Sequence, residues 1–224
     1  MCLIVLAWRA HPDFPLIVAA NRDELHERPA APAAFWEDRP GILAGRDLTA
    51  KGTWMGVARS GRFAAVTNYR GATEPSAPHS RGALVSGFLE STLSPGEFFK
   101  ELNPKLYSGF NLLAADGEEL WWTSNRDGGP RKLAPGIYGL GNLLLDSPDV
   151  EPAKERLRSV LEAALAVEAL FALLVPAKII NERYGTRCST IFIRTKEGQL
   201  RYAERAFDPS GADGETLRFE LAAG

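Results

Sequence analysis

The stretch CLIVLAWRAHPDFPLIVAANRDE at residues 2–24 decides the fold. It contains two short apolar runs rich in strand-forming residues, LIVLAW at 3–8 and PLIVAA at 15–20. Between them lies His11-Pro12-Asp13, which is typical of a turn. The pattern predicts an antiparallel hairpin, and its second strand should bring residues 21–23 back close to residue 2.

The rest of the chain repeats this hairpin pattern. Three more hairpins are predicted at 53–69, 110–124 and 190–207, each around a turn that contains glycine. One short strand is predicted alone, at 136–140. Helices are predicted at 80–89, 94–102 and 149–174, either from apolar periodicity or from a capping residue such as Ser94. Turn-forming residues predict loops at 21–40, 45–53 and 71–80. The tail after Asp208 is rich in Gly and Ala.

Strands in hairpins, with no alternation of parallel strands and helices, predict the fold class. We expect an α+β protein in which antiparallel sheets have helices packed outside them. No linker, repeat or low-complexity block divides the 224 residues, so a single domain over residues 1–224 is predicted.

The composition excludes several classes of protein. The formal net charge is −2 and the basic residues are scattered, so no nucleic-acid partner is expected. Two cysteines do not make a disulfide framework. The apolar run after Met1 is too short for a secretory signal, and no stretch approaches the roughly 18 apolar residues of a membrane span. A cytoplasmic protein without membrane insertion is therefore expected.

A cysteine follows the initiator methionine. Processing commonly removes methionine before a small residue, which would leave Cys2 with a free α-amine. An α-amine has a pKa of about 7.7–8.0, so it can accept the thiol proton near neutral pH. Cys2 would then supply both the attacking group and its base. The alternative is that Cys2 is a small buried hydrophobic residue at the chain end.

Four polar residues, Asn21-Arg22-Asp23-Glu24, end the second strand directly after its apolar run. They cannot all be buried without partners. Because the hairpin returns them close to residue 2, Asp23 could orient the α-ammonium group of Cys2. Asn21 or Arg22 could hold a polarised oxygen or a carboxylate. The alternative is a local turn with a surface ion pair.

Seven segments in order resemble one family. They are MCLIVLAW at 1–8, NRDE at 21–24, GRDLTAKGTWMGV at 45–57, VTNYRG at 66–71, SRGALVSGFL at 80–89, YGLGNLLLDSP at 138–148 and YGTRCSTIF at 184–192. Together they resemble the NRDE family, that of the transport and Golgi organisation protein 2, over nearly the whole chain. That family is similar in fold to the N-terminal nucleophile hydrolases. The resemblance implies a four-layer α/β/β/α sandwich of two stacked antiparallel sheets.

The resemblance also implies site residues, through the cholylglycine hydrolases and penicillin V acylases of that fold. Cys2 matches their nucleophile and Asp23 the aspartate that orients its amine. Asn68 and Asn142 match residues of the oxyanion hole, and Arg187 matches a late arginine. Binding of substrate is expected at Asn21, Arg22, Trp54 and Tyr69. The chain departs from these enzymes at Ala20, where they carry an arginine; here an arginine stands at Arg22 instead.

Three functions follow as hypotheses. The first is a cysteine amidohydrolase that cleaves an amide or similar acyl bond of a small molecule. The second is a non-catalytic carrier for haem or an acyl-lipid such as acyl-CoA, which the family resemblance implies through haem trafficking and lipid metabolism. The third is a trafficking factor acting through protein contacts. No cofactor is expected.

The remaining candidate residues have structural explanations. His11, His26 and His79 lack the spacing of metal ligands, so no metal is expected. Among them, His26 follows Asp23 by three residues and could act as a base near the thiol. The favoured alternative is a histidine in a surface loop. Cys188 is expected in the core, and a redox pair with Cys2 would require their strands to be neighbours.

Overall fold

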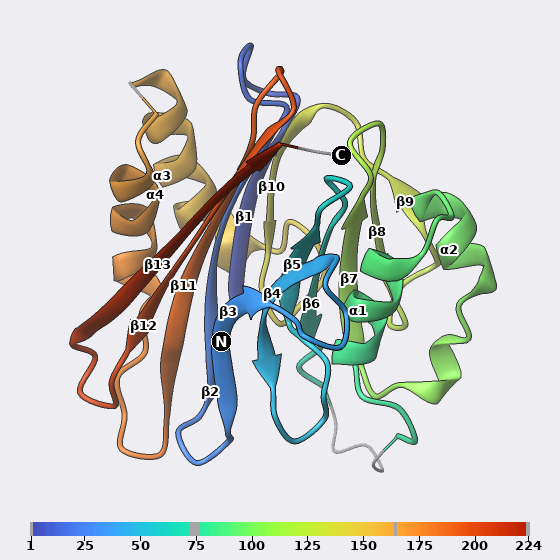
Figure 1. Cartoon of the computed structure of the whole chain (residues 1–224), viewed down its shortest axis with the longest axis horizontal. Helices are drawn as coiled ribbons and strands as arrows, with labels where there is room; N and C mark the ends of the chain where they lie inside the picture. The colour runs from blue at the N-terminus through green and yellow to red at the C-terminus, as the bar shows by residue number, and fades with distance from the viewer. Residues whose placement is uncertain (1, 72–76, 164, 223–224) are drawn as a thin grey trace. The chain divides into compact units, whose positions relative to one another are not determined.

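The computed structural model describes residues 2–71, 77–163 and 165–222. They form two compact units. The terminal unit comprises residues 2–28, 135–141 and 145–222, and the central unit comprises residues 29–134 and 142–144. Each unit contains one antiparallel sheet with two α-helices (Figure 1). The single domain stays a prediction.

The terminal unit is built on a sheet with the strand order β10-β1-β2-β11-β12-β13. Its strands are β1 (Leu3–Trp8), β2 (Leu16–Leu25), β10 (Gly136–Leu140), β11 (Tyr184–Arg194), β12 (Gln199–Phe207) and β13 (Asp213–Ala222). The predicted first hairpin is confirmed, because β1 and β2 pair from Leu3 opposite Asn21 to Trp8 opposite Leu16. The hairpin of β11 and β12 is confirmed as well, and Gly198 in its turn has a φ of 84°.

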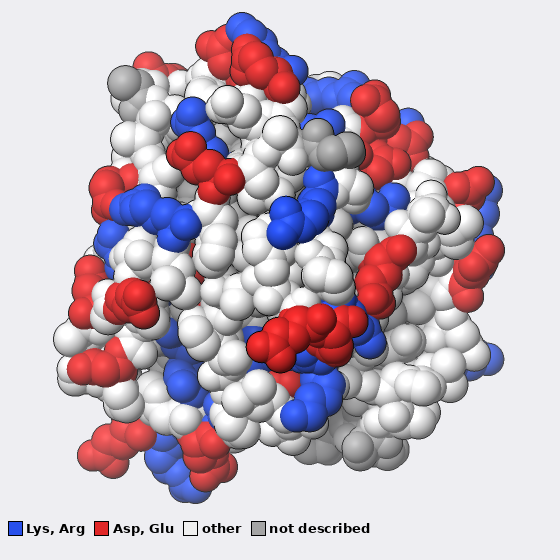
Figure 2. Space-filling view, in the orientation of Figure 1, with Lys and Arg blue, Asp and Glu red and all other residues white. Residues whose placement is uncertain are grey.

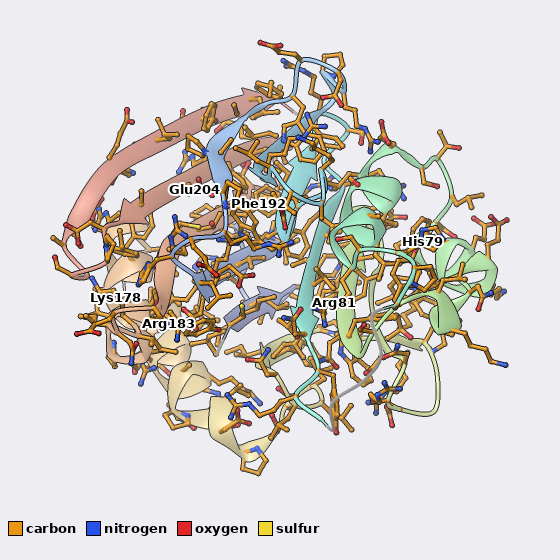
Figure 3. All side chains as sticks on the ribbon, turned by 90° about the horizontal axis from the view of Figure 1, so that it is seen from below. His79, Arg81, Lys178, Arg183, Phe192 and Glu204 are labelled. Carbon is orange, nitrogen blue, oxygen red and sulfur yellow. The ribbon has the colours of Figure 1, made fainter. Side chains whose placement is uncertain are left out.

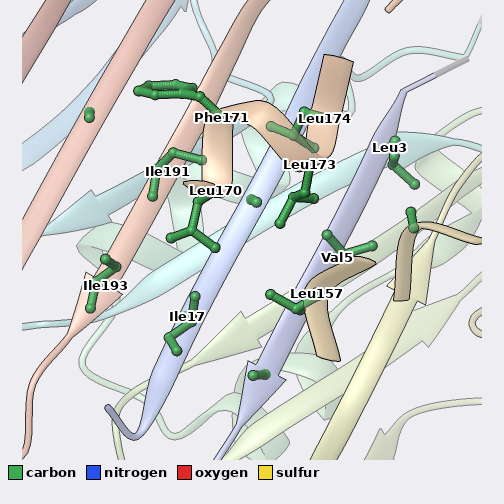
Figure 4. Packing of buried hydrophobic residues seen from close by; sticks show 14 of the residues in the cluster. Leu3, Val5, Ile17, Leu157, Leu170, Phe171, Leu173, Leu174, Ile191 and Ile193 are labelled. Carbon is green, nitrogen blue, oxygen red and sulfur yellow. The ribbon is translucent and has the colours of Figure 1, made fainter. Parts of the chain in front are cut away.

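Helices α3 (Glu151–Glu162) and α4 (Val167–Leu174) cover one face of this sheet. Figure 4 shows Leu157 of α3 and Leu170 of α4 in the same buried cluster as strand residues such as Val5 and Ile17. The prediction of one helix over 149–174 is wrong, because the backbone is extended at Ala166, with φ −129° and ψ 143°. Twenty-six helical residues would measure about 39 Å, whereas two short helices place both apolar faces on the sheet.

The central unit is built on a sheet with the order β3-β4-β5-β6-β7-β8-β9. Its strands are β3 (Ala30–Phe35), β4 (Ile42–Asp47), β5 (Met55–Ala58), β6 (Phe63–Asn68), β7 (Phe110–Ala115), β8 (Leu120–Ser124) and β9 (Arg131–Lys132). Helices α1 (Gly82–Glu90) and α2 (Pro95–Glu101) pack on it through buried residues such as Phe88 and Phe99. The predicted cap is confirmed, since Ser94 and Glu97 form a complete capping box.

Some predicted loops are strands. Strand β2 continues to Leu25, and β3 and β4 occupy parts of the regions 21–40 and 45–53 that were predicted to be loops. Pro32 was one reason for predicting a loop. In the structure, β3 is an edge strand whose register shifts between Ala31 and Ala34. An edge strand at such an irregularity tolerates the missing N–H of proline. The tail also forms an edge strand, β13, in which half-buried Leu217, Phe219 and Leu221 alternate with exposed Arg218 and Glu220. Residues 72–76 of the predicted loop 71–80 lie outside the described residues.

Surface and membrane features are simple. On the face shown in Figure 2, positive and negative side chains are interspersed, in line with the small net charge. Within the described part of the chain, no helix is long and apolar enough to span a membrane. The same residues contain no cluster of three His, Cys, Asp or Glu side chains that would suit a metal ion. The cytoplasmic location stays a prediction.

Candidate functional site

Cys2 lies at the start of β1, beside the polar end of β2. Since Leu3 pairs with Asn21, the next position places Cys2 opposite Arg22. The Asp23 N–H donates to the Cys2 Sγ at 3.4 Å, and the Cys2 thiol donates to the Asp23 carbonyl oxygen at 3.5 Å. The hairpin therefore brings the predicted nucleophile directly onto the backbone of Asp23.

The Asp23 carboxylate is fixed from the other neighbouring strand. Asp23 is 4% exposed, and its Oδ1 accepts a hydrogen bond of 2.6 Å from the Thr186 hydroxyl. The Thr186 Oγ1 in turn accepts from the Ile179 N–H at 2.9 Å. Thr186 was missed in the sequence, where the only signal is its place in the YGTRCSTIF segment. It holds the carboxylate in one orientation on a rigid sheet.

Electrostatics keep the Cys2 thiol protonated at neutral pH. Burial, and then the negative charge of Asp23, raise the pKa of Cys2, while the positive charge of Arg22 acts in the opposite direction. Arg22 is 6% exposed, and its guanidinium lies 3.9 Å from the Glu24 carboxylate. Because a thiol is a poor nucleophile, this site needs a base to deliver a thiolate.

Cys188 is not placed to form a disulfide with Cys2. Cys188 pairs with Arg22, so β2 runs between the two cysteines. Two strand spacings amount to about 9.5 Å, beyond the roughly 7 Å limit for bridged Cα atoms. The strands are therefore not the neighbours that a redox pair requires. Cys188 is buried as predicted, and burial followed by the charge of Glu204 raises its pKa well above the usual value.

Asn21 connects elements of the terminal unit. Its side chain is 3% exposed; the Nδ2 donates to the Leu174 carbonyl oxygen at 3.2 Å, and the Oδ1 accepts from the Ser189 hydroxyl at 2.6 Å. These bonds tie β2 to the end of α4 and to β11. The expected contact of Asn21 with substrate stays a prediction, beside this structural role.

Arg187 lies at a β-bulge between Thr186 and Cys188. Its guanidinium donates to the carbonyl oxygens of Leu25 and His26, each at 2.9 Å. His26 itself contacts the Asn181 carbonyl oxygen through Nε2 at 2.9 Å. These contacts close the turn after β2, so the structure shows Arg187 as a clamp on the backbone; its catalytic role stays a prediction.

Two predicted oxyanion residues are joined in the central unit. Asn142 donates from Nδ2 to the Asn68 carbonyl oxygen at 2.7 Å, and its own carbonyl oxygen accepts from the Arg70 N–H at 2.6 Å. Asn111, which is fully buried, donates to the Thr67 hydroxyl at 3.2 Å and to the Leu143 carbonyl oxygen at 2.8 Å. Sequence reasoning missed Asn111, a polar residue within the apolar run FNLLAA, although it holds the Asn142 segment on β6 and β7.

The two predicted aromatic contacts also lie in the central unit. The half-buried ring of Trp54 covers Gly45 so closely that a Cβ there would lie 2.3 Å from its Cη2 atom. Tyr69 follows β6, and its N–H donates to the Gly109 carbonyl oxygen at 2.9 Å. The structure explains why position 45 is glycine, and the substrate contacts of Trp54 and Tyr69 stay predictions.

Solved structures show the fold. The chain is similar to a conjugated bile acid hydrolase mutant from Clostridium perfringens, with a TM-score of 0.58, 8% identity and coverage of 100% of this chain and 98% of that one. It is also similar to the Caenorhabditis elegans ortholog of N-acylethanolamine-hydrolyzing acid amidase, with a TM-score of 0.56, 11% identity and coverage of 86% and 92%. Both are N-terminal nucleophile hydrolases, so the predicted fold class is confirmed.

Sequence relatives show the family. The model of "Transport and Golgi organisation 2" matches residues 1–177. The transport and Golgi organization protein 2 homologs of Bos taurus and Homo sapiens are 32% and 30% identical, each with 99% of both chains covered. The Drosophila melanogaster protein is 28% identical over 78% of this chain and 71% of its own. As the resemblance predicted, this chain belongs to the Transport and Golgi organisation 2 family.

Proposed function

We propose that this chain is a cysteine N-terminal nucleophile amidohydrolase that cleaves an amide or similar acyl bond of a small molecule. The observation that carries the proposal is the hydrogen-bonded contact of the Cys2 thiol with Asp23, whose carboxylate is fixed by Thr186. The fold supports it, because the structural neighbours are titled as an amidase and a bile acid hydrolase.

The first half of the proposed reaction forms an acyl-enzyme. Removal of Met1 leaves the α-amine on Cys2, and this amine accepts the thiol proton. The sulfur electron pair attacks the substrate carbonyl carbon, whose oxygen becomes an oxyanion. The carbon–nitrogen bond then breaks, and the α-ammonium group returns the proton to the departing nitrogen. The products are a free amine and a thioester on Cys2.

The second half releases the acid. Water gives a proton to the same α-amine and attacks the thioester carbon, and the proton then returns to the leaving sulfur. Asp23 acts throughout by stabilising the α-ammonium group, which explains why its carboxylate is held by Thr186. Asn68 and Asn142 are proposed as oxyanion donors, each worth up to about 3 kcal/mol of barrier lowering.

Mass spectrometry tests this proposal directly. Intact mass measures whether Met1 has been removed, and protein that lacks Met1 is then incubated with a panel of N-acyl p-nitroanilides. We expect release of nitroaniline and an acyl adduct located on Cys2. Cys2→Ala should give neither, whereas Cys188→Ala serves as the matched control and should keep both. A processed wild-type protein that forms no adduct with any amide of the panel contradicts the proposal.

The names of the relatives favour a second candidate, a carrier or trafficking protein on the same fold. Those names refer to transport and Golgi organization. In this alternative the chain binds haem or an acyl-lipid such as acyl-CoA, and no bond is broken. Spectral titration with haemin and thermal shift with acyl-CoA test it. The carrier alternative expects a shift that survives Cys2→Ala, and absence of a shift with either ligand contradicts it.

A further inference from the structure

Strand β13 is the longest edge strand among the strands that the structure describes. Four of these strands lie at the ends of the two sheets and pair on one side only: β3, β9, β10 and β13. Strand β3 contains Pro32 and a register shift, β9 has two residues and β10 has five, so they are poor templates for a further strand. Strand β13 has ten residues and no proline, so a further strand can add to it.

The regular part of β13 presents two opposite charges on one face. Residues 216–222 pair with β12 without a break in register. Arg218 lies on the face that carries α3 and α4, since it donates to the Glu168 carboxylate of α4 at 2.6 Å. Glu220, two positions on, shares that face and lies 3.8 Å from Arg201. The Arg218 and Glu220 side chains are 51% and 78% exposed, so this side of the edge is open to water.

The opposite face of β13 is apolar. Leu217, Phe219 and Leu221 alternate with the charged residues and are half-buried. Phe219 pairs with Tyr202 of β12, and the two rings pack edge-to-face with centroids 6.4 Å apart. Leu217 pairs with Glu204, which is labelled in Figure 3. Because each half-buried side chain keeps part of its apolar surface in water, a strand added at this edge would cover more of that surface.

The end of β13 is complementary to itself when two copies run antiparallel. A two-fold axis at Phe219 places this ring opposite its own copy, and aromatic pairs in that position are favourable. Arg218 then lies opposite Glu220 of the second copy, twice by symmetry. Leu217 lies opposite Leu221 in the same way. Moving the axis to Arg218 or to Glu220 would instead place two like charges opposite each other, which is destabilising.

We propose that two copies of this chain associate through their β13 strands, as an antiparallel pair centred on Phe219. The two six-stranded sheets then form one continuous sheet, with the helices of both copies on the same face. Each copy contributes the same residues, as a two-fold interface requires. One strand pair buries less surface than the roughly 1,200 Å² of stable complexes, so the association is weak and reversible. It does not depend on the proposed hydrolase activity.

Sedimentation equilibrium of the full chain, from about 10 μM to about 1 mM, tests the proposal in the range of weak association. We expect a dimer whose share rises through this range. NMR amide signals of residues 216–222 should change with concentration, whereas those of β10, at the other edge of the same sheet, should not. A monomer at every concentration, or changes at β10 in place of β13, overturns the proposal.

Charge reversal tests the register. Glu220→Arg and Arg218→Glu each place two pairs of like charges in the dimer, so each variant should dimerise about tenfold more weakly than wild type. An equimolar mixture of the two variants has opposite charges in both pairs and should dimerise like the wild type. The matched control is Glu197→Arg, which makes the same change of charge in the exposed turn between β11 and β12 and should leave dimerisation unchanged.

Rescue in the mixture separates pairing across the axis from damage to the strand, because a second variant cannot refold a damaged one. Arg218→Glu also loses the bond to Glu168, whereas Glu220→Arg changes a side chain that is 78% exposed and stays informative by itself. Wild-type dimerisation by Glu220→Arg, or no gain in a mixture of the two folded variants, overturns the proposed pairing.

Discussion

Polar side chains beside Cys2 in the terminal unit are buried, whereas those of the segment after α2 in the central unit are exposed. In the terminal unit, Cys2, Asn21 and Asp23 come within a few residues of an apolar strand and are bonded to buried neighbours. In the central unit, Asn103 and Lys105 of the segment after α2 are exposed. Buried groups with fixed partners are suited to chemistry, because their orientation costs nothing during a reaction. Exposed side chains can usually be substituted with little effect on stability.

The largest effect that would test this contrast is on turnover. Asp23→Asn keeps the shape of the side chain and can still accept the Thr186 bond, but it removes the negative charge beside the α-amine. We expect the rate of amide hydrolysis to fall by roughly 100-fold or more, in line with the loss of a group that supports general base catalysis.

The matched control is Asp13→Asn, which removes an exposed carboxylate bound to Lys196 in the same unit. It should leave kcat/KM within about twofold of wild type, as expected for a surface pair. An Asp23→Asn enzyme with wild-type kcat/KM would place the chemistry elsewhere.

A second test compares the two helix-on-sheet cores. Leu157 and Leu84 are both buried, one in each core. Leu157→Ala and Leu84→Ala should each lower the free energy of unfolding by about 2–5 kcal/mol. Hydrogen exchange should show lost protection mainly in β1 and β2 for the first variant and in β5 and β6 for the second. Equal loss in both sheets for both variants would mean that the two cores open as one.

A third test uses pH, because the terminal unit contains the buried thiol of Cys188. The pKa of Cys188 is raised in the folded protein, so above the ordinary thiol value of about 8.5 the unfolded chain loses a proton that the native one keeps. Stability is therefore complete below that pH and falls as pH rises toward the folded value, by at most about 1.4 kcal/mol per pH unit for one proton.

Urea unfolding between pH 7 and 10 checks this expectation. Cys188→Ala should have a shallower decline than wild type, while Lys105→Gln, which changes an exposed side chain of the central unit, should follow the wild-type slope. Identical slopes in wild type and Cys188→Ala would show that the buried thiol does not resist ionisation.

The smallest expected effect concerns the cap of α2 in the central unit. Ser94→Ala removes the hydroxyl that bonds the Glu97 N–H and should lower the free energy of unfolding by about 1 kcal/mol. Urea unfolding measures it, with Ser60→Ala in the exposed turn between β5 and β6 as the control. An unchanged midpoint would mean that α2 is held by packing of Phe99 alone.

Much of each sheet could be predicted from local sequence. Alternation of apolar residues and a glycine turn sufficed for β5 with β6, β7 with β8, and β11 with β12. The missed strand β3 is an edge interrupted by Pro32, and the missed edge β9 has only two residues. The missed strand β4 lies inside its sheet, but its apolar run ends at Ala44, before Gly45. The missed strand β13 does alternate from Leu217 to Leu221, so it could have been predicted from local sequence. The break between α3 and α4 was missed because the apolar periodicity continues through it.

The site was less predictable because its contacts are distant in sequence. Cys2 and Asp23 follow from one hairpin, so the sequence pattern suffices to bring them together. Thr186 approaches Asp23 from a strand 163 residues away, and no local pattern indicates that pairing. For the same reason, Arg187 was assigned by resemblance, whereas its guanidinium closes the turn at Leu25 and His26.

The bulge at Arg187 restricts insertions and deletions in β11. Thr186 and Ser189 are three residues apart, and in a regular strand they would point to opposite faces. The extra residue turns both toward the same face, where one bonds Asp23 and the other Asn21. Deleting one residue here would leave one of these two buried side chains without its partner. Insertions and deletions should therefore be far rarer between 186 and 189 than in the turn at 208–212.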